Sequence, residues 1–147
     1  MFRKLMSTTD DLAATILRLS LGVVFFAHGA QKALGWFGGF GFNGTMGFFT
    51  QKLNIPAPFA VLAIAAEFLG GMGLVVGLLS RIAAFGIACN MAIAVALIHI
   101  HIGFFANWYG NQKGEGFEFH ILAVAIALAI MIKGSGALSL DRALSKS

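Results

Sequence analysis

Long apolar segments with almost no charge recur four times along this chain of 147 residues. They cover about residues 12–34, 57–79, 82–104 and 117–132. A helix needs about 20 residues to cross a hydrocarbon core about 30 Å thick, so the fourth segment is short and the others have full length. Helices are expected because backbone amides in lipid must be hydrogen-bonded within their own segment. The sequence therefore predicts an all-α fold, a four-helix transmembrane bundle.

Composition supports the same class of protein. Hydrophobic residues make up 59% of the chain and charged residues 11%, whereas soluble domains carry roughly 25% charged residues. The 19 glycines and 15 phenylalanines suit helices that pack closely in lipid. The length allows one membrane domain, residues 1–147. The net charge of +4 is small, so the expected partner is the lipid bilayer and no nucleic acid.

Lysine and arginine positions predict the orientation. Cytoplasmic loops carry an excess of these residues. Six of them would lie on the side of both termini and three on the opposite side. We therefore expect both termini in the cytoplasm and the chain in the cell (inner) membrane. The six are Arg3, Lys4, Arg81, Lys133, Arg142 and Lys146, and the three are Lys32, Lys52 and Lys113.

Two outer connections follow, over residues 35–56 and 105–116. The first is rich in glycine and phenylalanine and is too apolar for a free linker. We expect it to lie in the membrane interface or over the mouth of the bundle, with Trp36 as an anchor. The second would place Trp108 and Tyr109 at the level of the lipid headgroups.

Histidines gather at one end of the predicted bundle. At about 1.5 Å per residue, His28, His99 and His101 would lie near the outer face. Glu118 and His120 stand at the outer start of the fourth segment. Polar residues near an interface also serve as amphipathic anchors. A ligand site and a structural polar cluster therefore both stay open.

Glu67 is the one charged residue of the second segment. It would lie about 15 Å from either face, where a lone carboxylate is costly. It must therefore be protonated, hydrated or paired. Arg18 is the expected partner, in a structural ion pair between the first two segments. The other interpretation is a carboxylate that handles protons in a cavity.

His99 and His101 pose a choice within the third segment. Helical steps of about 100° place them about 200° apart, so only one can face the bundle interior. Such a pair is a poor bidentate metal site on a straight helix, and no metal is expected. The residues alone do not decide between the two.

Three stretches of the chain resemble the DoxX family (DoxX/DoxD) of small membrane proteins. They are LRLSLGVVFFAHGAQKALG, NIPAPFAVLAIAAEFLGGMGLVVGLLSRIAA and HIGFFANWYGNQKGEGFEFH. The resemblance covers about residues 13–140 and implies a four-helix transmembrane bundle. The family pattern carries over to Arg18, His28, Gln31, Lys32, Glu67, Gly70, Gly71, Arg81, His99, Gly103, Phe104, Phe105 and Glu118.

The resemblance also implies a choice between the two histidines of the third segment. The family's usual H-L-P-x-G-F is similar to HIHIGF, which begins at His99. His99 would then face inward. His101 stands where proline is common in the family, and it is expected to face lipid or the interface.

For function, the resemblance implies more than one possible role. Some relatives are membrane subunits of thiosulfate:quinone oxidoreductase, and others are linked to quinone reduction or to oxidative-stress assemblies with soluble partners. This chain has no flavin or nicotinamide motif and no cysteine pair, so a bound cofactor or a partner would supply two-electron chemistry. The leading hypothesis is a quinone-interacting subunit of an oxidoreductase system, with a soluble oxidoreductase partner.

Quinone chemistry needs groups that exchange protons at the ring carbonyls and aromatic side chains that hold the ring. A quinone is the expected cofactor, and haem is the second choice. The proton-handling site would lie near the outer face. The expected catalytic residues are His28, Glu67, His99 and Glu118, and the expected cofactor-binding residues are Gln31, Lys32, Phe104 and Phe105.

Three alternatives stay open. Imidazoles on facing helices can ligate haem, although the chain has no attachment motif for it. A small-solute or proton transporter would use Glu67 and Arg18 at mid-depth. A non-catalytic scaffold or assembly subunit would use its glycine-rich faces to pack against another protein or against a second copy, as a homo-oligomer.

Overall fold

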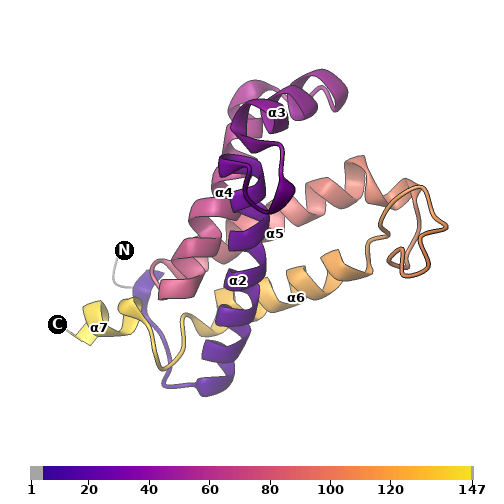
Figure 1. Cartoon of the computed structure of the whole chain (residues 1–147). Coiled ribbons are helices and arrows are strands. Elements are labelled where there is room, and N and C mark those ends of the chain that lie inside the picture. Colours follow the sequence, from indigo (N-terminus) through magenta and orange to yellow (C-terminus); the bar gives the residue numbers. More distant parts are fainter. Residues whose placement is uncertain (1–4, 147) are drawn as a thin grey trace.

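The computed structural model describes residues 5–146, and the folded elements in this range are all helical (Figure 1). Arg3 and Lys4, two residues of the predicted charge bias, lie outside the described residues. The elements are α2 (Leu12–Leu34), η1 (Trp36–Gly38), α3 (Gly41–Gly47), η2 (Phe48–Lys52), α4 (Ala57–Val76), α5 (Ser80–Leu97), η3 (His99–His101), α6 (Glu118–Lys133) and α7 (Leu140–Lys146).

Three of these helices, α2, α4 and α5, are long and apolar enough to cross a membrane. Helix α6 has 16 residues and is shorter. Large apolar side chains stay exposed on the outer faces, as for Phe59, Leu62 and Leu122, which suits contact with lipid. The all-helical fold is thereby confirmed for the described residues. A fourth span and cytoplasmic termini stay predictions.

Helices α2 and α4 pack against each other in antiparallel register through glycines. A Cβ atom at Gly29 would lie 2.3 Å from the Cα atom of Phe68, and one at Gly71 would lie 2.3 Å from the backbone nitrogen of Phe26. No side chain fits at such distances, so glycine is what allows the two backbones to approach. The contact places residue 29 of α2 opposite residues 67 and 68 of α4.

Helices α5 and α6 run side by side and diverge from α2 and α4 toward the connection over residues 98–117 (Figure 1). Leu21 and Phe25 of α2, Leu74 of α4, Ile87 of α5 and Ile130 of α6 belong to the buried core. The four helices therefore share one apolar core, and they separate at the end away from α7.

Charged side chains meet the four helix ends at the side of the bundle near α7. The Asp11 and Asp141 carboxylates accept hydrogen bonds from the first amides of α2 and α5. Arg18 and Arg81 donate to carbonyls in the last turns of α4 and α6. Each charge has the sign that complements the helix dipole, and each satisfies backbone groups that lack a helical partner.

The prediction of a third helix over residues 82–104 is wrong at the outer end of that helix. Helix α5 stops at Leu97, and His99–His101 form a short 3₁₀ turn. The cause is a fold-back of the connection, in which the Phe117 and Glu118 amides bond to the carbonyls of Gly103 and Phe104. The second expected helix also ends early, at Val76. The first expected connection, residues 35–56, is largely helical, since it contains η1, α3 and η2.

Candidate functional site

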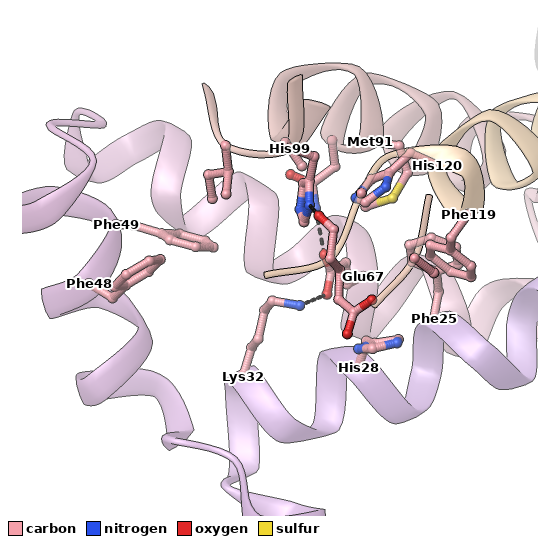
Figure 2. Close-up of a pocket in the computed structure, with 16 residues that line it drawn as sticks. Phe25, His28, Lys32, Phe48, Phe49, Glu67, Met91, His99, Phe119 and His120 are labelled. Carbon is pink, nitrogen blue, oxygen red and sulfur yellow. Dashed lines mark hydrogen bonds and ion pairs between the residues drawn. The ribbon is translucent and has the colours of Figure 1, made fainter. Parts of the chain in front are cut away.

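A cavity of about 460 Å³ lies where the helices separate. Small-molecule sites in proteins have volumes of about 300–1,000 Å³. Figure 2 shows the side chains that surround it. Its lining is Phe25, His28, Lys32, Phe48, Phe49, Glu67, Asn90, Met91, Ala94, Ile98, His99, Ala106, Glu115, Gly116, Phe119 and His120. The cavity thus draws on α2, η2, α4, α5, α6 and the connection over residues 98–117.

Glu67 supplies a buried carboxylate to this cavity, with an exposed fraction of 3%. One carboxylate oxygen pairs with the Lys32 ammonium, and the other accepts a hydrogen bond of 2.8 Å from the Asn90 amide. The Lys32 side chain keeps 27% of its surface exposed. The ion pair and the amide compensate a charge that would be costly if it were alone in an apolar interior.

The expected ion pair between Arg18 and Glu67 is not formed. Positions 18 and 29 are eleven residues apart, which corresponds to about 16 Å of helix, and residue 29 is the one that lies opposite Glu67. Arg18 is therefore too far along α2 and donates instead to the carbonyls of Ser135 and Leu138 and to the end of α4. Lys32 lies within one turn of residue 29 and takes its place.

Two histidines stand in contact at another part of the wall. The ring centroids of His99 and His120 are 4.0 Å apart, with 43° between the ring planes. The Nδ1 atom of His99 is 2.7 Å from the backbone carbonyl oxygen of Glu115. His120 is 7% exposed, and its Nδ1 atom has no hydrogen-bond partner among the described residues. The cavity wall therefore contains an unsatisfied polar atom.

Phenylalanine rings form two opposing walls in Figure 2. Phe25 and Phe119 stack with centroids 6.2 Å apart, and His28 lies 6.4 Å from each of them. Phe48 and Phe49 of η2 stand on the other side, with centroids 6.1 Å apart. Such walls suit a flat apolar group.

Four of the residues predicted from the sequence line this cavity together: His28, Lys32, Glu67 and His99. They lie on two helices and a short turn, and the first and last of them are 71 residues apart in the chain, so only the fold brings them together. His101, expected to face lipid or the interface, is exposed and does not line the cavity.

Four other predicted residues lie outside the cavity lining. The Glu118 carboxylate accepts hydrogen bonds from the Ala106 amide at 2.9 Å and the Trp108 indole at 3.2 Å, so it holds the outer connection. Gln31 donates to the carbonyl of Phe37 at 3.3 Å. Phe104 and Phe105 are also absent from the lining. The phenylalanines of α2, η2 and α6 line it instead.

Several lining residues were not selected from the sequence. Asn90 had a usable signal, because a polar amide in the middle of an apolar segment needs a partner just as Glu67 does. His120 was recognised as part of the histidine cluster but not as a site residue. Phe48 and Phe49 could not be selected from the sequence, because the first connection contains several other phenylalanines with similar neighbouring residues.

Comparison with known proteins gives two relatives of similar length. A Bacillus subtilis (strain 168) protein named "Putative oxidoreductase CatD" is 29% identical over 136 residues, covering 92% of this chain and 90% of the relative. A Haemophilus influenzae protein named "Uncharacterized protein" is 25% identical over 151 residues, covering 97% and 90%. No solved structure matches the chain.

The model of the DoxX family matches residues 13–100, which is more than half of the chain. This range contains α4, α5 and all of α2 except Leu12, and these are the three helices that are long and apolar enough to cross a membrane. It also contains Lys32, Glu67, Asn90 and His99 of the cavity. The chain therefore belongs to the DoxX family and is a multi-pass membrane protein.

Proposed function

We propose that this protein binds a quinone in the cavity and serves as the membrane subunit of a quinone-linked oxidoreductase system. One observation carries the proposal: a single cavity combines phenylalanine walls with a Lys32–Glu67 ion pair and a contacting His99–His120 pair. The name of the B. subtilis relative, "Putative oxidoreductase CatD", supports the reaction class.

The cavity suits the shape and polarity of a quinone. A quinone ring is flat and apolar on its faces, and its carbonyl oxygens are hydrogen-bond acceptors. The phenylalanine walls offer ring contacts. Lys32 has three N–H donors, and only one of them is used by Glu67. A second donor is therefore available to a carbonyl oxygen of the ligand, while Glu67 neutralises the ammonium charge.

Protons would be exchanged at the histidine pair. Two imidazoles whose centroids are 4.0 Å apart repel each other when both are charged. Positive charge on both rings at once is therefore disfavoured, and the pair would take up one proton at a time. The quinone supplies the two-electron chemistry, and a soluble oxidoreductase partner exchanges the electrons with it. The side chains of this chain bind the ligand, orient it and hold a proton.

We place the cavity near the outer face of the inner membrane. Arg81 and Lys133 stand at the opposite end of the bundle, beside α7. Lys32 is neutralised by Glu67, so it no longer counts among the loop charges on the cavity side. Lys52 and Lys113 stay on that side, and the positive charge bias favours both termini in the cytoplasm.

Haem fits this arrangement less well. Axial imidazoles must stand on opposite sides of an iron atom, but rings whose centroids are 4.0 Å apart are in van der Waals contact. No iron plane fits between His99 and His120 in that geometry. The quinone proposal needs no such separation.

The test is the ligand content of the protein purified gently with its native lipids. We expect about one quinone per protein by solvent extraction, together with a near-ultraviolet change in the oxidised-minus-reduced absorption spectrum. Saturable binding of an added short-chain quinone to the protein in lipid nanodiscs is the second readout. A Soret band would favour haem instead. A flat spectrum without saturable quinone binding would contradict the proposal and favour a scaffold or transport role.

A further inference from the structure

The tautomer of His99 follows from its contact with the backbone of Glu115. A carbonyl oxygen can only accept a hydrogen bond. The Nδ1 atom of His99, 2.7 Å from that oxygen, must therefore carry the proton and donate it. In a neutral imidazole the other nitrogen, Nε2, then has a free lone pair. His99 thus brings a hydrogen-bond acceptor to the cavity wall.

His120 adds a second polar atom without a partner. Its side chain lines the cavity and is more than nine-tenths buried, and its Nδ1 atom bonds to nothing among residues 5–146. A buried polar atom that stays unpaired costs about 1–3 kcal/mol. Such atoms in native structures call for a ligand or a water molecule. The atom belongs to a ring in contact with His99 (Figure 2), so one ligand group can reach both histidines.

Three other polar side chains of the cavity, Lys32, Glu67 and Asn90, differ from the histidine pair. Both oxygens of the Glu67 carboxylate already accept hydrogen bonds, one from Lys32 and one from Asn90. Lys32 still has donors to offer. Figure 2 shows His99 and Lys32 on opposite sides of Glu67. The cavity therefore presents a free acceptor at His99 and a free donor at Lys32.

We propose that the cavity selects the reduced, hydroxyl-bearing form of its aromatic ligand, a hydroquinone, with His99 as the residue that determines this preference. The inference rests on the proposed function, since it names the form of the ligand that the same cavity prefers. One hydroxyl group donates to the Nε2 atom of His99. The oxygen of the other hydroxyl group accepts from Lys32. The Nδ1 atom of His120 donates to the oxygen of the first hydroxyl when it carries the imidazole proton, because the single hydroxyl proton is given to His99 and the hydroxyl oxygen can still accept.

A quinone satisfies only part of this pattern. Its oxygens accept but do not donate, so they can pair with Lys32 and with the Nδ1–H group of His120 but leave the acceptor on His99 without a partner. Sites built to pair with a hydroxyl group discriminate against analogues that lack it, and the half-buried His99 loses this hydrogen bond when the ligand is a quinone. The same holds for a methyl ether of the hydroquinone, which has the ring and the oxygens but no donor.

The experiment compares three probes on the full chain in lipid nanodiscs, under anaerobic conditions, by calorimetric titration. The probes are trimethylhydroquinone, its quinone and its dimethyl ether. We expect the hydroquinone to bind about tenfold or more tightly than the ether and the quinone. In His99→Ala this preference should disappear. In His101→Ala, the matched control at an exposed histidine outside the cavity, it should be retained.

Rescue and failure are distinguishable. In His99→Gln the amide oxygen can accept the hydroxyl proton, so part of the preference should return. Equal binding of hydroquinone and dimethyl ether to the unmodified protein, or tighter binding of the quinone, would overturn the inference while the proposed function stands. Absence of binding by all three probes would overturn the proposed function and this inference with it. The comparison on the unmodified chain decides the matter even if His99→Ala does not fold.

Discussion

Lys32 in the last turn of α2 forms an ion pair with Glu67 in the middle of α4, at the wall of the cavity. The carboxylate is buried, and the ammonium is partly exposed to the cavity. The pair joins the two helices and keeps a charged group ready for a ligand. The pair therefore contributes both to the stability of the fold and to the chemistry of the cavity.

Removal of one member of this pair should destabilise the protein strongly. In Lys32→Met the buried carboxylate loses its counter-charge, and breaking a buried ion pair typically costs about 3–5 kcal/mol. Thermal unfolding in nanodiscs measures the loss. The double variant Lys32→Met with Glu67→Gln should recover much of it, since neither charge remains. A single variant as stable as the parent would contradict the role of the pair.

The matched control for that prediction is Lys133→Met. Lys133 pairs with Asp11 at 3.3 Å, but its side chain is 56% exposed. Exposed ion pairs contribute about 0–1 kcal/mol. The control should therefore shift the unfolding temperature far less than Lys32→Met does.

A double-mutant cycle should show that Arg18 and Glu67 contribute independently to the stability of the protein. Arg18→Met removes hydrogen bonds to backbone carbonyls at the α7 end and should cost about 3 kcal/mol. Because Arg18 and Glu67 share no partner, the effects of Arg18→Met and Glu67→Gln should add within about 0.5 kcal/mol. Lys32→Met and Glu67→Gln should instead couple strongly. Coupling between Arg18 and Glu67 would mean that the helix register differs from that described.

The contact between α2 and α4 should not tolerate an added methyl group. In Gly29→Ala the new Cβ atom would lie 2.3 Å from a backbone atom of Phe68, which cannot move without moving the helix. Overpacking of this kind costs about 1–3 kcal/mol or more. Helix α3 offers the control, because a Cβ atom at Gly47 meets nothing within 4 Å. Gly47→Ala should leave the unfolding temperature unchanged or raise it slightly, and equal losses for both variants would contradict the prediction.

The cap of α2 should make stability depend on pH in the acidic range. The hydrogen bond from the Ala14 amide, followed by that from Lys133, lowers the pKa of Asp11 below its ordinary value of 3.8. A group whose pKa is lowered by folding stabilises the protein above its unfolded pKa, and this contribution is lost as the pH falls through the folded pKa. Stability should therefore decline below about pH 4, and less steeply in Asp11→Asn, where the amide still caps the helix without a charge.

Unfolding temperatures of the parent and of Asp11→Asn at neutral and acidic pH measure this effect. The two proteins should differ most at neutral pH and converge as the pH falls. Parallel curves over the whole range would show that the carboxylate charge of Asp11 has no part in stability.

The local pattern of the sequence determined where the main helices lie. The first apolar segment was predicted over residues 12–34, and α2 spans Leu12–Leu34. Hydropathy and the need to hydrogen-bond backbone amides in lipid depend on the residues of one segment. A helix can therefore be predicted from that segment without knowing which other segment packs against it. The same holds for the gathering of His28, His99 and His120, which follows from helix length and alternating direction.

Which side chains meet within the bundle was decided by the tertiary structure. The partner of Glu67 is Lys32 because glycine contacts set the register of α2 against α4. That register cannot be predicted from the depth of residues along either segment alone. The end of α5 at Leu97 likewise depends on backbone hydrogen bonds made by residues 103 and 104 to the start of α6. An apolar segment forms a helix because of its own residues. Its register against a neighbouring helix, and the residue at which it ends, depend on close contacts between segments far apart in the chain.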